Sequence, residues 1–301
     1  MASQRTARAR LQGAGFDRFL PYLLLAPAVL LVLAVVVYPL VYGVQTSTKF
    51  YRFGTAISDV GFAQYRQAWN DPLFRGALWT TLKFVTAAVA IETTLGLGLA
   101  LLCVRELPFI RTLRMVLIVP MVITPVVVGI VFRLIYASDV GLFTSLSGLV
   151  GGGSIGILDN ERGAFWGLVF LDVWEWTPLI FLILLAGLQS LPQEPFEAAR
   201  VDGAGTWRTF VDHTLPMLTP VLVVAIVLRS IDAFTTFDQV YVLTHGGPGT
   251  ATQLISIYGY DTFFRFQQYG YAAAMLLMVA LIVLACAFLG IRLIRRQAAT
   301  A

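Results

Sequence analysis

Residues 270–290 read GYAAAMLLMVALIVLACAFLG and contain no charged side chain. A helix of about 20 apolar residues spans a hydrocarbon core about 30 Å thick. This stretch therefore predicts a transmembrane helix, which we expect to continue to about Leu293. The composition of the whole chain also indicates a membrane protein, because 58% of its 301 residues are hydrophobic and only 13% are charged. Soluble domains carry roughly 25% charged residues, so a soluble enzyme is excluded.

Five other apolar runs of similar length fill most of the chain. They extend approximately from Leu20 to Val44, Ala77 to Val104, Leu113 to Tyr136, Gly163 to Leu188 and Met217 to Phe237. A cleaved signal peptide is the alternative for the first run, but its length and the spans that follow favour an uncleaved helix. Pro21, Pro27 and Pro39 are expected to kink or end that helix. We predict an all-α membrane protein with six transmembrane helices.

The positive residues indicate the orientation, because Lys and Arg near helix ends tend to remain cytoplasmic. On one side of the six spans lie Arg5, Arg8, Arg10, Arg18, Arg105, Arg111, Arg114, Arg200, Arg208, Arg292, Arg295 and Arg296. The other side holds Lys49, Arg52, Arg66, Arg75, Arg162 and Arg265. Both termini are therefore predicted to be cytoplasmic, with tails at residues 1–19 and 295–301 and a membrane domain at residues 20–294.

Several chemistries are excluded by composition. Cys103 and Cys286 form no C-x-x-C pair, and the two histidines have no ligand-like spacing, so no metal site is expected. The net charge of +4 comes from scattered arginines rather than a basic block, which argues against nucleic acid as a partner. Neither Lys49 nor Lys83 stands in a phosphate-binding loop, so ATP hydrolysis requires another polypeptide.

The polar connection from Gln189 to Pro216, between the fourth and fifth spans, has helical signals of its own. Pro195 suits the first turn of a short helix, which Gly203 and Gly205 then break. Thr206 is expected to cap a second short helix, which Leu215 and Pro216 end before the next span. From the spacing alone, three interpretations stay open: a partner-docking element, an amphipathic helix on the membrane, and a loop folded over the chain's own cytoplasmic face.

The same connection resembles a known motif. Glu197-Ala198-Ala199, then Asp202-Gly203-Ala204, Trp207, Phe210 and Leu215-Pro216, is similar to the EAA motif of permease subunits of ATP-binding cassette importers. The resemblance implies a type I importer permease fold. It also implies a helix-turn-helix at about residues 191–216 that sits in a groove of the ATPase. The residues implied to couple to the ATPase are Glu197, Ala198, Ala199, Asp202, Gly203, Leu215 and Pro216.

A second stretch narrows the family. Between Arg229 and Gly249, the groups Asp232-Ala233-Phe234, Phe237-Asp238, Tyr241 and Thr244-His245-Gly246-Gly247-Pro248 resemble carbohydrate-type permeases such as the maltose, glycerol-phosphate and trehalose systems. The resemblance implies a bacterial plasma membrane subunit with a carbohydrate substrate, a second homologous permease, two copies of an ABC ATPase and an extracytoplasmic sugar-binding protein. ATP and Mg would be held by the ATPase, and no cofactor by this chain. The maltose permease of this type is longer and has more than six spans. The resemblance therefore implies the coupling role for this chain but not a maltose-like binding pocket.

Charged residues also lie inside or at the margins of the apolar runs. They are Lys83, Glu92, Arg133, Asp172, Glu175, Arg229 and Asp232. Each costs about 2.5 to 3.5 kcal/mol at a helix centre on insertion scales, which requires a compensating role. Glu92 is the deepest, and both an interhelical pair and a pathway role remain open for it. Lys83 and Arg133 are close enough to helix ends to snorkel.

Aromatic and carboxylate side chains alternate in two places. Indole rings stack on sugar rings and carboxylates accept hydrogen bonds from hydroxyls, so Trp174-Glu175-Trp176 is a candidate sugar path. An interfacial aromatic belt is the alternative. Asp232, Phe237, Asp238 and Tyr241 repeat this mixture, although from spacing alone they merely end a helix. The substrate-path candidates are Glu92, Trp174, Glu175, Asp232, Phe237, Asp238 and Tyr241.

The chain is thus predicted to form half of the translocation path of an ATP-driven sugar importer and not to be an enzyme. The first alternative is an ion-coupled secondary transporter that uses Glu92 and Asp232 as a relay, but the inverted repeats typical of such proteins are not evident. The second is an intramembrane enzyme with Asp172 and Glu175 as acid and base. No nucleophile, metal cluster or phosphate-binding loop accompanies these carboxylates.

Overall fold

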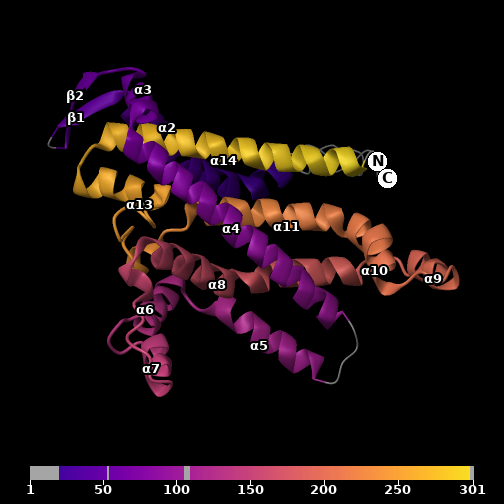
Figure 1. Ribbon diagram of the computed structural model, residues 1–301. Coiled ribbons are helices and arrows are strands. Elements are labelled where there is room, and N and C mark those ends of the chain that lie inside the picture. The colour runs from indigo at the N-terminus through magenta and orange to yellow at the C-terminus, as the bar shows by residue number, and fades with distance from the viewer. Residues whose placement is uncertain (1–19, 53, 105–108, 299–301) are drawn as a thin grey trace, which may run out of the picture.

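The computed structural model describes residues 20–52, 54–104 and 109–298 and shows a bundle of long helices (Figure 1). Within these residues, five helices are long and apolar enough to span a membrane: Leu20–Ser47, Pro72–Cys103, Glu161–Gln189, Thr206–Thr235 and Tyr269–Phe288. A bent pair of shorter helices makes up to six. The predicted all-α membrane fold is confirmed.

Long helices alternate along the chain with short helical segments and a single hairpin of strands. In chain order the elements are η1 (Leu33–Val37), α2 (Tyr38–Ser47), β1 (Lys49–Arg52), β2 (Thr55–Asp59), α3 (Ala63–Asn70), α4 (Pro72–Cys103), α5 (Ile110–Val122), α6 (Pro125–Ile135), α7 (Leu142–Leu149), η2 (Ile157–Asp159), α8 (Glu161–Gln189), α9 (Glu194–Val201), α10 (Thr206–Thr209), η3 (Phe210–Thr214), α11 (Leu215–Thr235), α12 (Asp238–Leu243), α13 (Ile255–Tyr260), η4 (Asp261–Arg265) and α14 (Tyr269–Ala298). Strands β1 and β2 pair antiparallel. This hairpin was not anticipated from the sequence.

Figure 1 places two groups of short elements at opposite ends of the bundle. The hairpin of β1 and β2 lies with α3 and α13 at one end, and α9 and α10 lie at the other. Helices α4, α8, α11 and α14 run between these ends. The predicted N-terminal tail at residues 1–19, with its four arginines, and Arg105 lie outside the described residues. Helix α14 continues to Ala298, past the boundary predicted at residue 294.

The third predicted span, from Leu113 to Tyr136, is not one straight helix. Helices α5 and α6 meet at an angle of 94°. The break falls at Ile123 and Thr124, whose ψ angles of 138° and 132° are extended. Thr124 precedes Pro125, and the ring of a proline disfavours helical geometry in the residue before it. The hydropathy of this run identified a membrane segment, but Pro125 divides it.

One predicted helix end is wrong, at Leu215 and Pro216, and of the two outcomes expected for Pro39 the helix does not end there. Pro39 lies inside the first helix, and Pro216 lies inside a helix that is continuous from Thr206 to Thr235. In both places a π-helical turn comes directly before the proline, η1 in the first and η3 in the second. Proline has no N–H to donate to the carbonyl four residues earlier. The wider π turn accommodates this loss, so the helix continues.

Side-chain caps fix where two spans begin. Asp71 Oδ1 accepts a hydrogen bond from the Leu73 N–H at 2.9 Å, and Pro72 follows at the first position of α4. Asn160 Oδ1 accepts from the Gly163 N–H at 2.7 Å at the start of α8. Both caps satisfy backbone donors that have no partner inside a helix.

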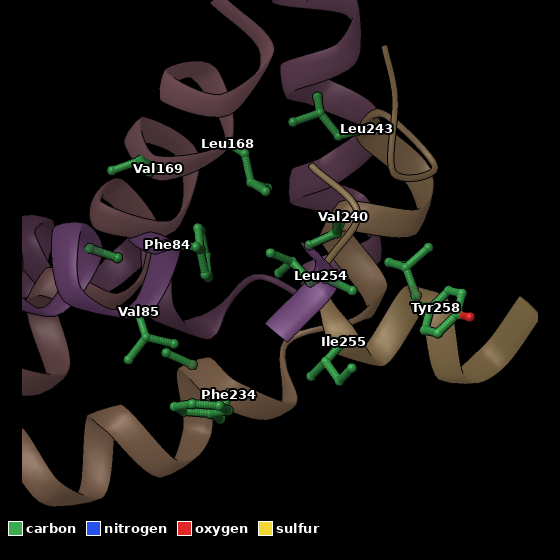
Figure 2. Close-up of a cluster of buried hydrophobic side chains, with 14 of the residues drawn as sticks. Phe84, Val85, Leu168, Val169, Phe234, Val240, Leu243, Leu254, Ile255 and Tyr258 are labelled. Carbon is green, nitrogen blue, oxygen red and sulfur yellow. The ribbon is translucent and has the colours of Figure 1, made fainter. Parts of the chain in front are cut away.

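The core lies where α4 and α8 pack against the shorter helices α12 and α13. Figure 2 shows Phe84 and Leu168 from the two long helices close to Val240 and Leu254. The close approach of α4 to α8 depends on Gly96, because a Cβ there would lie 2.9 Å from Ile180 Cγ2. Small residues permit such close helix pairs in membranes.

Candidate functional site

A buried ion-pair cluster joins three of the spans. Arg229 of α11 donates through Nη2 to Glu92 Oε1 of α4 at 3.1 Å, and its Nε lies 2.9 Å from Glu92 Oε2. The same Nη2 pairs with Asp172 Oδ2 of α8. All three side chains are fully buried. A guanidinium suits this site because its planar fork presents several donors to carboxylates at once.

Three further residues complete the cluster. Arg229 Nη1 pairs at 3.0 Å with Asp232 Oδ2, which lies one helical turn further along α11 and is 47% exposed. Gln239 of α12 donates through Nε2 to Asp172 Oδ1 at 2.6 Å. The guanidinium carbon of Arg229 lies 5.3 Å from the centre of the Trp176 ring. Arg229 therefore contacts carboxylates from α4, α8 and α11, and Asp172 extends the network to α12.

Glu175 lies beside this cluster but outside its pairing. Its side chain is 1% exposed, and neither carboxylate oxygen has a hydrogen-bond partner among the described residues. Glu175 stands three positions after Asp172, so the two side chains share one face of α8. A buried polar group without a partner is costly and calls for an explanation. Glu175 is therefore the chemically unsatisfied member of this region.

The two tryptophans that flank Glu175 point in different directions. Trp176 packs on Arg229, whereas the ring of Trp174 lies 5.3 Å from that of Phe132 on α6 and is partly exposed. Trp174 and Trp176 are two positions apart, which is about 200° around the helix axis, so their side chains lie on different faces of α8. The predicted trio Trp174-Glu175-Trp176 thus does not form one surface.

The predicted aromatic residues after the fifth span do come together. The ring centres of Phe237 and Tyr241 are 5.2 Å apart, and both lie within 5.3 Å of Tyr260 on α13. Tyr241 also contacts His245 at 4.2 Å. Asp238 is exposed at the start of α12. Tyr260 is an addition that the sequence did not indicate, because it lies nineteen positions beyond Tyr241.

The helix-turn-helix between the fourth and fifth spans is present. Helix α9 ends in a turn where Gly203 has φ +73°. The Ala204 N–H donates to Ala199 O at 2.9 Å and the Gly203 N–H to Arg200 O at 3.1 Å. This is the Schellman arrangement, in which glycine takes the left-handed position. Thr206 is not the cap that we predicted, since Gly205 occupies that place and no side chain caps α10.

This helix-turn-helix, which we call the α9–α10 hairpin, has one exposed side and one side that faces the spans. Val201 and Trp207 are 87% and 76% exposed, and Glu197, Ala198 and Asp202 are also exposed. On the inner side, Ala199 is buried. A groove of about 730 Å³ separates the hairpin from the ends of α4 and α8. The exposed part of this α9–α10 hairpin thus carries apolar Val201 and Trp207 beside polar Glu197 and Asp202, and Trp207 also lines the groove.

At the opposite end, Asp71 ties the start of α4 to α13 and α14. Asp71 Oδ2 accepts from the Tyr258 hydroxyl at 2.6 Å and from the Tyr271 hydroxyl at 2.5 Å. Burial raises the pKa of Asp71, but these bonds and those from the Leu73 and Phe74 backbone outweigh it, so the pKa lies below its ordinary value of 3.8. Burial raises the pKa of Tyr258 to about 12. The carboxylate is therefore held in its charged form.

Metal ligands are not gathered anywhere in the described part of the chain, where no group of three or more His, Cys, Asp or Glu side chains has suitable geometry. The arrangement has features suited to transmitting movement and to binding. One end has an exposed helical hairpin, the middle has a charge cluster that joins the spans, and an aromatic group lies beyond it.

Comparison with known proteins gives the family. The family of binding-protein-dependent transport system inner membrane components matches residues 92–299, more than half of the chain. This chain belongs to that family. It is 35% identical to the trehalose/maltose transport system permease protein MalF of Thermococcus litoralis over 88% of this chain and 90% of that protein. It is 33% identical to the sulfoquinovosyl glycerol transport system permease protein SmoG of Agrobacterium fabrum, with 93% and 92% covered.

Solved structures agree in fold. A bacterial ABC transporter involved in the import of the polysaccharide alginate superposes with a TM-score of 0.80 at 20% identity, covering 95% of this chain and 99% of that one. The MetNI methionine ABC transporter gives a TM-score of 0.56 over 77% of this chain. The resemblance to importer permeases is confirmed, and membership of a transport family does not favour the enzyme or secondary-transporter alternatives.

The sequence identified the charges in the spans but not their arrangement. Arg229 and Asp172 were named as charges in the spans, and Asp172 also as acid or base of the enzyme alternative, but neither was predicted to pair with the other, and Gln239 was missed. The sequence did contain one signal for this cluster: four carboxylates lie in or at the margins of the spans, and only one arginine, Arg229, lies deep in a span to pair with them. Glu92 forms the interhelical pair that was one of its two predicted roles.

Proposed function

We propose that this chain is the transmembrane permease subunit of an ATP-driven sugar importer in the bacterial plasma membrane. It forms half of the translocation path, and both termini lie in the cytoplasm. The relatives named for trehalose, maltose and sulfoquinovosyl glycerol support a carbohydrate substrate. The arginine distribution supports the orientation, because it puts the α9–α10 hairpin on the side richer in positive charge.

The observation that carries this proposal is the continuity between the hairpin and the charge cluster. One helix runs from Thr206 to Thr235, and its 30 residues cover about 45 Å. Its first turn is α10 of the exposed hairpin, and its other half carries Arg229. A displacement of the hairpin therefore reaches the cluster that joins α4, α8 and α11 without crossing a loop.

The family and this geometry support the following partners. Two copies of an ABC ATPase hold ATP and Mg and receive the hairpin, with Glu197, Ala198, Ala199, Asp202 and Gly203 at the contact. A second homologous permease supplies the other half of the path, and an extracytoplasmic sugar-binding protein delivers the substrate. Lipid surrounds the spans, and nucleic acid is not a partner. Exposed Val201 and Trp207 support a protein contact at the tip of the hairpin.

The proposed substrate path uses the predicted residues, with Tyr260 added and Glu92 removed from direct contact. Phe237 and Tyr241, joined by Tyr260, offer ring faces for sugars, and Asp232 and Asp238 offer exposed carboxylates. Glu175 has oxygens without partners but is 1% exposed, so it meets sugar hydroxyls only in a conformation that opens its side of α8. Trp174 remains a candidate on its own surface. Glu92 contributes through its pair with Arg229 instead of by direct contact. Leu215 and Pro216 continue the helix into the span.

The test is ATP-dependent sugar uptake by vesicles that contain all the partners. Gly203→Pro combined with Glu197→Ala is expected to abolish uptake, because proline fixes φ near −65° and the turn needs +73°. Gly205→Pro is the matched control, since φ there is already −69°. Co-purification of the ATPase with each variant, expressed at a high level, checks whether the complex still assembles. Unchanged uptake in the double variant, or uptake by the chain alone without nucleotide, would contradict the proposal.

A further inference from the structure

Two cations of the predicted spans, Arg133 and Lys83, take no part in the charge cluster, and Arg133 donates to Val242 O at 3.1 Å. Lys83 of α4 is exposed, and its Nζ lies 5.9 Å from the centre of the Trp79 ring. Among the described residues no carboxylate pairs with it. The side chain lines a cavity of about 410 Å³ between α4 and α8, with Trp79, Thr86, Phe165 and Trp166 among the lining residues. Lys83 is the one charged group in an otherwise mainly apolar cavity.

This cavity lies away from the charge cluster. Lys83 and Glu92 are nine positions apart on α4, which at about 100° per residue puts them on opposite faces of the helix. Glu92 faces Arg229 and the interior, so Lys83 faces outward. Trp79 and Trp166 are both exposed on this outward face. Exposed tryptophans on the outer face of spans are typical of the boundary between lipid tails and headgroups.

The depth of Lys83 matches that boundary. Helix α4 has 32 residues and is therefore about 48 Å long, which exceeds a core of about 30 Å by about 9 Å at each end if the helix is centred. Lys83 lies eleven residues after Pro72, about 16 Å along the axis, and so about 7 Å inside the core. A lysine stem of about 6 Å brings the ammonium close to the headgroup level.

We propose that Lys83, flanked by Trp79 and Trp166, binds the phosphate of an anionic phospholipid. With both termini in the cytoplasm, as the proposed function has them, this lipid belongs to the outer leaflet. The ammonium neutralises the phosphate, Thr86 adds a hydroxyl, and the apolar remainder of the cavity holds the first part of an acyl chain. A phosphate within reach of the ammonium also offsets the cost of an unpaired charge in an apolar helix.

The test uses the assembled transporter purified from vesicles of phosphatidylglycerol and phosphatidylcholine, with retained lipid counted by native mass spectrometry. Lys83→Met is expected to lower retained phosphatidylglycerol about fivefold, the effect of one basic group near an anionic surface. Lys83→Arg keeps the charge and is expected to retain the lipid. Arg75→Met, which removes a cation from an exposed position on the same helix, is the matched control.

Three results would overturn the proposal. The first is equal phosphatidylglycerol retention by Lys83→Met and the parent. The second is release of the second permease by Lys83→Met, which would make Lys83 an ion pair between subunits. The third is displacement of the lipid by inorganic phosphate, which would indicate a site for soluble anions. ATP-dependent uptake, measured in parallel, reports on the proposed function separately, because Lys83 lies outside the cluster and the hairpin.

Discussion

Removing the charge of Arg229 is the sharpest test of the central cluster. Arg229→Met fills a similar volume but leaves Glu92 and Asp172 buried without their cation. Breaking a buried pair by removing one partner costs about 3 to 5 kcal/mol, because the remaining charge is desolvated and unpaired. At roughly 2 to 4 °C per kcal/mol for a chain of this order of size, the apparent melting temperature is expected to fall by about 6 to 20 °C.

The second half of this prediction concerns compensation. If the loss comes from the unpaired carboxylate, then removing Glu92 as well relieves part of it. Arg229→Met with Glu92→Met is therefore expected to be less destabilising than the sum of the single changes, by an interaction energy of about 1 to 3 kcal/mol. Asp172 keeps its hydrogen bond from Gln239 in every variant, so the cycle isolates the pair between α4 and α11.

The assay is thermal unfolding of the purified transporter in detergent, followed by tryptophan fluorescence. Arg208→Met is the control, because Arg208 pairs with Asp212 at 3.3 Å on the surface, with 79% and 50% of the side chains exposed. Exposed pairs contribute less than about 1 kcal/mol. The reasoning is refuted if Arg229→Met shifts the transition no more than Arg208→Met does, or if the changes at Arg229 and Glu92 are additive.

Three further outcomes are expected. Gly96→Ala is expected to destabilise the contact between α4 and α8, because its Cβ would lie 3.1 Å from the Phe181 backbone nitrogen. Gly98→Ala meets no atom within 4 Å and is expected not to lower the melting temperature, since alanine also favours the helix. The lowered pKa of Asp71 means that its stabilising effect is present above 3.8 and lost as the pH falls through the lower folded value. Asp71→Asn should therefore flatten acid unfolding curves in that range, and equal acid sensitivity would count against the hydrogen bonds from its tyrosines. Glu175→Gln should change ATP-dependent sugar uptake with little change in melting temperature, since its oxygens have no partner to lose.

Hydropathy and glycine signals predicted most of the architecture because they act locally. The fourth predicted span, from Gly163 to Leu188, differs by two residues or fewer from α8. The turn at Gly203 was also predicted, because its positive φ is a property of one residue and its neighbours. Proline was less informative. Pro125 breaks a span, while Pro39 and Pro216 lie inside continuous helices preceded by π turns.

The candidate site required contacts between segments far apart in the sequence. Glu92 and Arg229 are separated by 137 positions, and nothing local indicates that they meet. Gln239 looked like an ordinary polar residue after a span, yet it donates to Asp172 across 67 positions. The cost of each buried charge could be predicted from composition, but its partner depends on how α4, α8 and α11 pack.

The packing also restricts how the spans can move. Arg229 holds carboxylates of α4 and α8 at once, so α11 cannot slide or rotate relative to these helices without exposing or separating buried charges, at a cost of about 3 to 5 kcal/mol. Gly96 adds a close contact between α4 and α8 that resists shear. The hairpin enters α11 through η3, a π turn, and such turns often mark the places where helices bend. Movement of the hairpin should therefore be divided between bending at η3 and displacement of α4, α8 and α11 as one body. Access on the two sides of the membrane would then change where this body meets its neighbours, at the break between α5 and α6 and along the exposed first helix, rather than inside the cluster.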